Sequence, residues 1–193
     1  MRLDIKGEIG KTVALLEALA GDRELVAAIA RAAEMIAAAL KAGRKILFLG
    51  NGGSAADAQH LAAELVGRLA LERKALPALA LTADTSVLTA LGNDYGFDQI
   101  FCRQVEAHGQ ADDVLVAIST SGRSPNVLAA LAAARQRGLA TIGLAGATGG
   151  DMAELCDVCL KMPSRETQKI QEAHIVVGHI ICGLVEQAIA SPA

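Results

Sequence analysis

Residues 45–65 read KILFLGNGGSAADAQHLAAEL. The apolar run Ile46–Leu49 predicts a buried strand, and the pattern after the glycine turn 50–54 predicts a helix. Glycines let the backbone N–H groups of such a turn approach a ligand closely, and Ser54 is expected to cap the helix. Because the N-terminus of a helix carries a partial positive charge, this turn is expected to bind a phosphate or another anionic group.

Two polar residues on this helix, His60 and Glu64, are four residues apart and therefore share a face. They form a candidate metal pair or acid/base pair, although by themselves they fit an ordinary polar face better. The last predicted helix offers partners, because His179 lies in an apolar run, where a histidine needs a specific contact. A helical wheel nearly superposes Glu172 on His179 and puts Gln171 about 80° away. Two helices that each offer a histidine and an oxygen ligand can close a zinc site, with Gln171 and Glu172 both open as the oxygen ligand.

The composition indicates a single domain without a general attraction to nucleic acid or to anionic membranes, because the 193 residues carry a net charge of −3. Much of the 52% hydrophobic fraction is alanine, which is typical of closely packed helices and of burial between subunits. No apolar segment is expected to span a bilayer, since the best candidate, 175–185, is interrupted by His179. The amino terminus mixes acidic and basic residues, so we expect no secretory signal, a cytoplasmic location and reduced cysteines.

Short apolar runs alternate with helical patterns over residues 43–193, which predicts an α/β core of three layers, α/β/α, around a central parallel sheet. Two helices with a break near Gly21–Asp22 form an N-terminal extension over residues 1–42. No linker divides the chain, so 1–193 is expected to be one domain. The predicted strands are 45–49, 76–81, 114–118, 140–145 and 157–161. The predicted core helices end near 69, 91, 107, 137, 155 and 190, with a polar turn at 92–96.

The cleanest strand, Val114–Ile118, ends in a hydroxyl-rich loop, Ser119–Ser124. Ligands of open α/β sheets bind beyond the carboxyl ends of the strands. Four hydroxyls in six residues exceed what a helix cap needs, which favours phosphate binding. Ser124 before Pro125 is also a good signal for a cap and a first helical turn. The loop lacks the lysine of a P-loop, which argues against a nucleotide.

Other polar residues are expected to be structural. Cys156 and Cys159 form a lone CxxC pair in a predicted buried strand, where a metal or redox role is the less favoured interpretation. The basic residues Arg68, Arg73 and Lys74 are expected to lie on a solvated face or loop.

Four motifs, in this order and at this spacing, resemble those of the sugar isomerase (SIS) domain family. They are GNGGSAADAQHLAAEL at 50–65, LGNDYGF at 91–97, ISTSGRSPNV at 118–127 and KIQEAHIVVGHII at 169–181. The resemblance covers nearly the whole chain and implies a flavodoxin-like SIS domain. It also implies an aldose–ketose isomerase that converts D-sedoheptulose 7-phosphate to D-glycero-D-manno-heptose 7-phosphate, the first step of nucleotide-activated heptose biosynthesis.

The resemblance further implies one zinc ion per subunit and a homotetramer with active sites at the subunit interfaces. The implied zinc ligands are His60, Glu64, Gln171 and His179. The implied contacts to the sugar phosphate are Asn51, Gly52, Gly53, Glu64, Asn93, Asp94, Ser119, Thr120, Ser121, Ser124 and Gln171. The adjacent Arg123 stands where some relatives have a small polar residue, and it offers a further phosphate contact.

Isomerisation through an enediol(ate) needs a base near the carbon that loses a proton and an acid near the carbonyl oxygen. We assign these roles to Glu64 and His179, respectively. The alternative is a non-enzymatic SIS-domain protein, either one that binds the replication initiator DnaA or a phosphosugar-sensing module. The DnaA-binding relative has similar glycine and serine loops but lacks the glutamate and the second histidine, and this chain has both.

Overall fold

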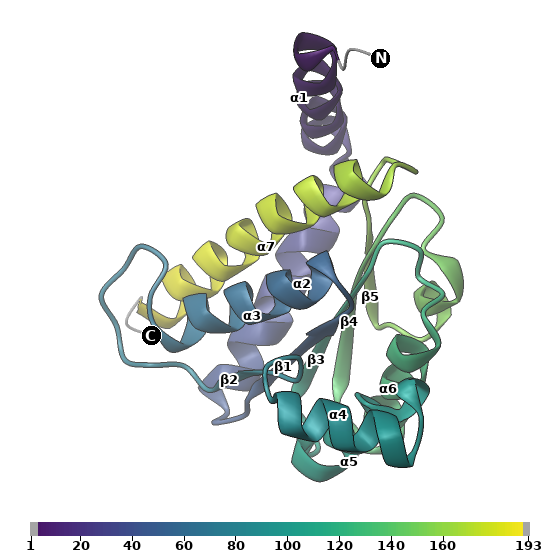
Figure 1. Cartoon of the computed structure of the whole chain (residues 1–193). Coiled ribbons are helices and arrows are strands. Elements are labelled where there is room, and N and C mark those ends of the chain that lie inside the picture. Colours follow the sequence, from purple (N-terminus) through teal and green to yellow (C-terminus); the bar gives the residue numbers. More distant parts are fainter. Residues whose placement is uncertain (1–3, 191–193) are drawn as a thin grey trace.

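The computed structural model describes residues 4–190 (Figure 1). Its α-helices are α1 (Ile5–Gly21), α2 (Arg23–Lys41), α3 (Gly53–Val66), α4 (Thr85–Asp94), α5 (Cys102–His108), α6 (Pro125–Gln136) and α7 (Thr167–Ala190). Its strands are β1 (Ile46–Gly50), β2 (Ala78–Ala80), β3 (Val114–Ser119), β4 (Ala140–Ala145) and β5 (Val158–Lys161). Two short 3₁₀ helices, η1 (Phe97–Gln99) and η2 (Gly150–Glu154), complete the fold.

The strands form one parallel sheet in the order β2-β1-β3-β4-β5. β1 and β3 are buried along their whole length, which explains their unbroken apolar sequences. Alternate side chains pack on opposite faces: Phe48 joins the cluster under α2, α3 and α7, whereas Leu47 joins the cluster under α5 and α6. The predicted three-layer α/β/α architecture, with two helices before the sheet, is confirmed.

Strand order places the functional loops together. β1 pairs with β3, and Gly50 lies opposite Ile118 in their register. Both strands run in the same direction, so the glycine turn after β1 and the serine loop after β3 leave the same edge of the sheet. The sheet therefore brings together two loops that lie about seventy residues apart in the sequence.

The N-terminal part of helix α1 projects from the rest of the molecule (Figure 1), whereas Leu15 and Leu19 near its other end are buried in the core. The chain turns between α1 and α2 at Asp22, whose side chain accepts a hydrogen bond from the Leu25 amide and so caps α2. Along α1, Ile5, Ile9 and Val13 are 69%, 60% and 50% exposed. This apolar stripe has no partner within the described part of the chain.

Helix α7 is long and apolar enough to cross a membrane, with a mean hydropathy of 1.6 in its most apolar window. The expectation that no segment would reach this length was wrong, because His179 does not interrupt the helix. In this fold 44% of that window is buried, and α7 packs against α2 and α3 as a core helix.

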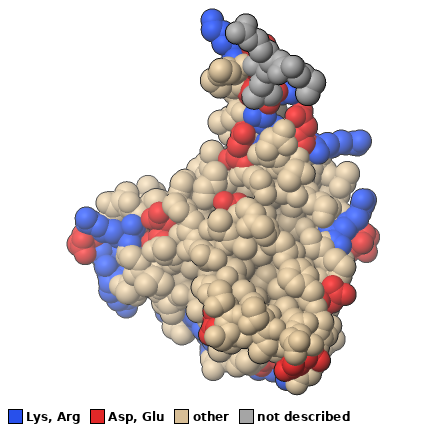
Figure 2. All heavy atoms as spheres, viewed as in Figure 1, with Lys and Arg blue, Asp and Glu red and all other residues tan. Residues whose placement is uncertain are grey.

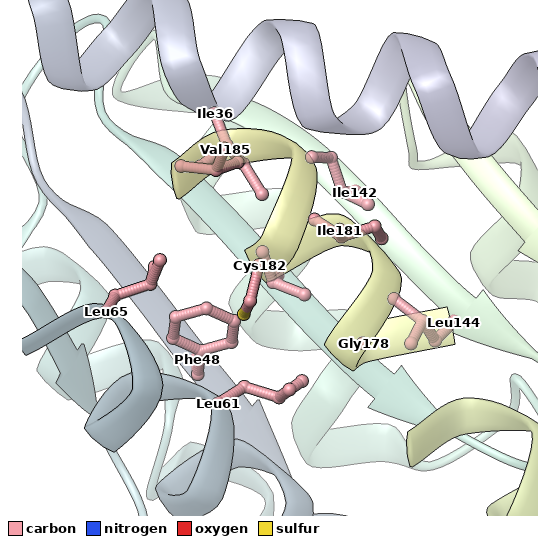
Figure 3. A pocket seen from close by; sticks show the side chains of 11 residues that line it. Ile36, Phe48, Leu61, Leu65, Ile142, Leu144, Gly178, Ile181, Cys182 and Val185 are labelled. Atoms are coloured by element: carbon pink, nitrogen blue, oxygen red, sulfur yellow. The ribbon is translucent and has the colours of Figure 1, made fainter. Parts of the chain in front are cut away.

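The core between α2, α3, α7 and the sheet contains one small cavity (Figure 3). Its volume is about 10 Å³, and its walls include Ile36 of α2, Leu65 of α3 and Cys182 of α7. A buried water needs about 10–15 Å³ and several polar partners. This apolar gap is therefore a packing space and not a binding site.

Three local expectations were wrong. Ser54 lies within α3 and not at its cap, because Gly52, with φ of 57°, takes the N-cap position. The polar turn expected at 92–96 is partly helical, because α4 continues through Asp94. Arg73 is not solvated: its side chain is only 4% exposed and contacts Glu186.

Candidate functional site

Three side chains from two helices meet at one point. His60 and Glu64 project from one face of α3, and His179 approaches them from α7. The Nε2 atoms of His60 and His179 lie 2.8 Å apart, and Glu64 Oε1 lies 3.4 Å from the same nitrogen of His60. One candidate ligand atom from each residue fits within a span of 4.8 Å. The predicted meeting of the two helices is therefore present in the structure.

The chemistry of these donors fits a metal ion. Two imidazole nitrogens and one carboxylate oxygen are a ligand set found in catalytic zinc sites, where three protein ligands leave one position open. His60 is 48% exposed at its side chain and Glu64 is 20% exposed, so both can be reached from solvent. The structure thus supports a metal-binding triad at His60, Glu64 and His179 without identifying the metal.

The structure distinguishes Gln171 from Glu172, the two candidates for the oxygen ligand on α7. Glu172 Oε2 accepts a 2.7 Å hydrogen bond from the Thr12 hydroxyl on α1 and also contacts the Lys169 ammonium. These contacts, that of Thr12 first, lower the pKa of the Glu172 carboxyl. Gln171 lies over the start of α3, where a Cβ placed on Gly53 would come within 2.6 Å of its Nε2. Glu172 therefore binds α1, and Gln171 is the residue that faces the glycine turn.

A cavity of about 260 Å³ lies where the glycine turn, the serine loop and α7 meet. Its lining includes most of the predicted phosphate contacts: Asn51, Gly52, Gly53, Ser119, Thr120, Ser124 and Gln171. The predicted contact Ser121 is not part of this lining; it is exposed, and its hydroxyl accepts a hydrogen bond from the Arg123 amide. Arg123 is exposed as well.

The hydroxyl of Ser124 is not used as a helix cap. Ser124 occupies the N-cap position of α6, but its side chain makes no capping hydrogen bond. Its hydroxyl lies 3.2 Å from the hydroxyl of Ser119, which also accepts a hydrogen bond from the Gly122 amide. The predicted cap position before Pro125 is therefore confirmed, but the side chain does not cap the helix, and Ser124 lines the cavity instead.

The predicted contacts Asn93 and Asp94 lie elsewhere in this chain. They end α4, are exposed, and bond to each other through Asn93 Nδ2 and Asp94 Oδ1, 2.7 Å apart. Near them, a larger cavity of about 490 Å³ is lined mainly by α4, η1 and the glycine turn. This cavity shares Asn51 and Gly52 with the smaller one. The glycine turn therefore separates two adjoining hollows, and neither is lined by Asn93 or Asp94.

Two polar residues near the site escaped the sequence interpretation. Asn126, 1% exposed, exchanges two side-chain hydrogen bonds with Asn51. Asp57 lies one turn before His60, and its Oδ2 has no hydrogen-bond partner among the described residues. Burial raises the pKa of Asp57, against the effect of His60, which lowers it. Asn126 lies in the motif around Pro125 and could have been found there. Asp57 precedes His60 by three residues, so helical spacing could have placed it on the same face.

The cysteine pair offers little reactivity. Within residues 4–190 all four cysteines are free thiols. Burial raises the pKa of Cys156 to about 12 and also raises that of Cys159. Because the thiolate is the reactive form, a raised pKa disfavours both redox and metal chemistry at this pair.

A parallel α/β/α sheet with two anion-type loops and a metal-type triad beyond one edge defines a class: α/β proteins that bind phosphorylated small molecules. A family model described as SIS domain matches residues 11–146. The curated phosphoheptose isomerase of Rhodospirillum rubrum is 63% identical over 164 residues, which cover 85% of this chain and 87% of that protein. That of Aneurinibacillus thermoaerophilus is 52% identical over 185 residues, 96% of this chain and 93% of that protein.

Solved structures agree with these relatives. The structure of phosphoheptose isomerase GmhA from Neisseria gonorrhoeae has a TM-score of 0.89 at 44% identity, and covers 95% of this chain and 97% of that chain. That of a phosphoheptose isomerase from Francisella tularensis has a TM-score of 0.88 at 37% identity, with coverage of 95% and 96%. The chain belongs to the SIS domain family, in its phosphoheptose isomerase branch, and the resemblance seen in the motifs is confirmed.

Proposed function

We propose that the protein converts D-sedoheptulose 7-phosphate to D-glycero-D-manno-heptose 7-phosphate, the first step of nucleotide-activated heptose biosynthesis. One observation carries the proposal: His60, Glu64 and His179 converge in a chain of the phosphoheptose isomerase branch. Binding of the replication initiator is not favoured, because the closely similar curated relatives are isomerases.

The phosphate of the substrate is assigned to the cavity at the serine loop. The cavity is lined by three hydroxyl residues, Ser119, Thr120 and Ser124. Helix α6 begins beside it, and a helix N-terminus attracts an anion. Along α3, Gly53 precedes His60 by seven residues, which corresponds to about 10 Å of helix. An extended seven-carbon sugar phosphate can bridge such a span. Its phosphate then binds at the serine loop while its first two carbons lie near Glu64.

The proton chemistry is assigned to Glu64 and His179. The Glu64 carboxylate removes a proton from C1 of the ketose and returns it to C2, so the base is regenerated. His179 protonates the carbonyl oxygen on C2 and then, as the neutral imidazole, takes the hydroxyl proton from O1 as the aldehyde forms, so its own proton is restored. The double bond of the enediol(ate) intermediate lies between C1 and C2. No redox partner is needed, because the electrons that leave C1 reduce C2 within the same molecule.

We assign one zinc ion per subunit to His60, Glu64, Gln171 and His179. The triad supports three of these ligands by its geometry. Gln171 is supported as the fourth because Glu172 is held by Thr12 and Lys169. When bound, zinc supplies positive charge that polarises the oxygens on C1 and C2. The remaining predicted contacts also keep their assignment to the sugar phosphate: Asn51, Gly52, Gly53, Asn93, Asp94 and Ser121.

A homotetramer with active sites at its subunit interfaces is part of the proposal. Figure 2 shows charged side chains on α1 and on the loop after α3, whereas the wide face between them carries few charges. Beside this weakly charged face, Ile5, Ile9 and Val13 of α1 form an exposed apolar stripe. Exposed apolar patches of this kind mark protein interfaces. Contacts from a second subunit would also bring Asn93 and Asp94 into an active site.

We place the enzyme in the cytoplasm. Its four cysteines are free thiols, which suits a reducing compartment. Its phosphorylated substrate belongs to the same compartment, because sugar phosphates are charged and do not cross a bilayer unaided.

The test is an assay of the purified protein with sedoheptulose 7-phosphate, before and after treatment with a chelator and after zinc is returned. We expect turnover that is lost on chelation and restored by zinc. Glu64→Gln should abolish turnover with the fold intact, whereas Glu72→Gln, an exposed glutamate on the next loop, should not.

Absence of turnover in the zinc-loaded wild type would overturn the isomerase assignment. Capture of the replication initiator by such an inactive protein would establish the alternative. Full activity in Glu64→Gln would remove Glu64 as the base while leaving the reaction itself in place.

A further inference from the structure

Helices α3 and α7 touch along a continuous seam that extends beyond the triad. In Figure 3, Leu61 and Leu65 of α3 line the same small cavity as Gly178 and Cys182 of α7. A Cβ placed on Gly178 would come within 2.7 Å of Leu61 Cδ2, so the helices approach as closely as glycine allows. The ligand atoms of His60 and His179 meet next to this contact. Any change in helix spacing along the seam therefore alters the triad.

At one end of the seam, Arg73 binds the C-terminus of α3. Its Nη2 donates a 2.8 Å hydrogen bond to the backbone carbonyl of Glu64, and its Nη1 donates one of the same length to the carbonyl of Gly67. The last carbonyls of a helix have no partner within the helix. The guanidinium supplies a partner, and one of the carbonyls that it holds belongs to the proposed catalytic base.

The partner of Arg73 is Glu186 on α7. Arg73 Nη2 lies 3.3 Å from Glu186 Oε1, and the two side chains are 4% and 1% exposed. Glu186 also accepts hydrogen bonds of 2.8–2.9 Å from the amides of Leu69, Ala70 and Leu71. Burial alone would raise the pKa of Glu186, but these amides and Arg73 lower it, so the carboxylate stays charged.

Glu186 follows His179 by seven residues and therefore lies on the same side of α7, about two turns away. The loop after α3 is thus tied to the helix that supplies the second histidine. A buried ion pair contributes little net stability compared with apolar packing, because both charges must leave water. Its geometry is demanding, however, and several directed hydrogen bonds fix one arrangement of α3 on α7.

We propose that Arg73 and Glu186 are positioning residues that hold Glu64 and His179 opposite each other by joining the C-terminal end of α3 to α7. The proposal rests on the proposed function for the roles of Glu64 and His179. The two residues touch neither metal nor substrate; they act through the backbone of α3 and the register of the seam.

The experiment compares Arg73→Met, Arg73→Lys and Glu186→Gln with two controls, Arg68→Met and Glu72→Gln. The control residues form an exposed pair in the same loop, with side chains 62% and 83% accessible. Two quantities are measured on the full chain. The first is the pair of ring NMR signals of His60 and His179 in metal-free protein, with exposed His108 as internal reference. The second is the affinity for Zn²⁺ by competition with a chelating dye.

We expect Arg73→Met and Glu186→Gln to shift both ring signals and to weaken Zn²⁺ binding by about 10- to 100-fold, the range seen when groups behind a metal ligand are removed. Arg73→Lys keeps the positive charge but not the paired N–H donors of the guanidinium. Its Zn²⁺ affinity and ring signals should lie between those of the wild type and those of Arg73→Met. It also serves as the test variant if Arg73→Met does not fold. The control variants should match the wild type.

Ring signals and Zn²⁺ affinity equal to wild type in folded Arg73 and Glu186 variants would overturn the proposal. A wild type that binds no Zn²⁺, but whose ring signals still move in Arg73→Met, would refute the zinc assignment while upholding the positioning role. The metal-free measurement thus separates the two proposals.

Discussion

Asn51 and Asn126 exchange two side-chain hydrogen bonds, each 2.9 Å long, across the space between the glycine turn and the start of α6. Each amide nitrogen donates to the side-chain oxygen of the other residue, so each residue is both donor and acceptor in the pair. The pair ties the loop after β1 to the helix that follows the serine loop. These two hydrogen bonds therefore join the two halves of the proposed phosphate site.

Asn126→Ala should weaken substrate binding and lower stability. The substitution removes a buried side chain and leaves the half-buried Asn51 amide without its partner, which costs about 1 kcal/mol, the lower end for an unsatisfied polar group. We expect a higher KM for sedoheptulose 7-phosphate and a lower urea midpoint. The double variant Asn51→Ala/Asn126→Ala should lose less stability than the sum of the single variants. Strict additivity would contradict the coupling.

Gly178→Ala should separate α3 from α7. The added Cβ would lie 2.7 Å from the buried Leu61 side chain, and such overpacking costs about 1–3 kcal/mol. We expect a lower melting temperature and weaker Zn²⁺ binding. Gly183→Ala on the same helix is the matched control, because its Cβ would meet Leu69 at an ordinary 3.6 Å. It should be neutral or stabilising by up to about 1 kcal/mol. Equal effects at both positions would show that helix spacing does not matter.

Gln171→Ala and Glu172→Ala should affect different properties of the protein. The first removes the residue over Gly53 and should lower Zn²⁺ affinity and turnover with little change in thermal stability. The second removes the partner of Thr12 and Lys169 and should loosen α1 while leaving Zn²⁺ affinity near that of the wild type. Dye competition measures the affinity, and proteolysis within α1 measures the loosening. Loss of Zn²⁺ in Glu172→Ala alone would reverse the assignment.

Stability should fall between pH 6.5 and 5 because of His174. Burial, against a weaker effect of the Ala145 backbone, lowers the pKa of this histidine from 6.5 to about 4. Below pH 6.5 the unfolded chain gains a proton that the native protein does not accept until about pH 4. The free energy of unfolding therefore decreases with falling pH at about 1.4 kcal/mol per pH unit, by about 2 kcal/mol between pH 6.5 and 5 and by about 3 kcal/mol in total at pH 4. Urea unfolding at several pH values measures this slope.

His174→Leu removes the titrating group and should flatten the curve in this window. An unchanged slope in the variant would assign the pH dependence to other groups.

Ile9→Glu should reduce the oligomeric state. A charge in the middle of the exposed stripe of α1 would have to be buried in an interface formed by that stripe. Light scattering after size exclusion should give a smaller mass than that of the wild type. Lys6→Glu, an exposed position off the stripe, is the control with the same new side chain. An unchanged mass for Ile9→Glu would place the interface elsewhere.

The sequence was sufficient for the layers of the fold because each strand carries an apolar run and each helix a clear period. Helix ends were harder. The helix α4 was predicted to end near Leu91, before a polar turn, but Asp84 caps its start and it continues to Asp94, two residues before Gly96, whose φ is 89°. Asn93 and Asp94 are therefore helical, and local polarity was a poor guide to the turn.

For the site, spacing identified His60 and Glu64, because residues on one helix face are fixed by the period of 3.6. The apolar run around His179 indicated that this histidine has a specific partner. The same reasoning failed for Arg73. An arginine in a polar loop reads as solvated, and its burial depends on Glu186, which follows 113 residues later. Glu172 shows the same limit, since only the position of α1 reveals that Thr12 binds it.

The histidines that meet across the seam are separated by 119 positions in the chain. During synthesis α3 emerges long before α7, so an incomplete polypeptide has only part of the proposed metal site. Under this proposal the site forms only after the last helix has left the ribosome and docked. A chain truncated before His179 would lack this capacity even if its sheet had formed.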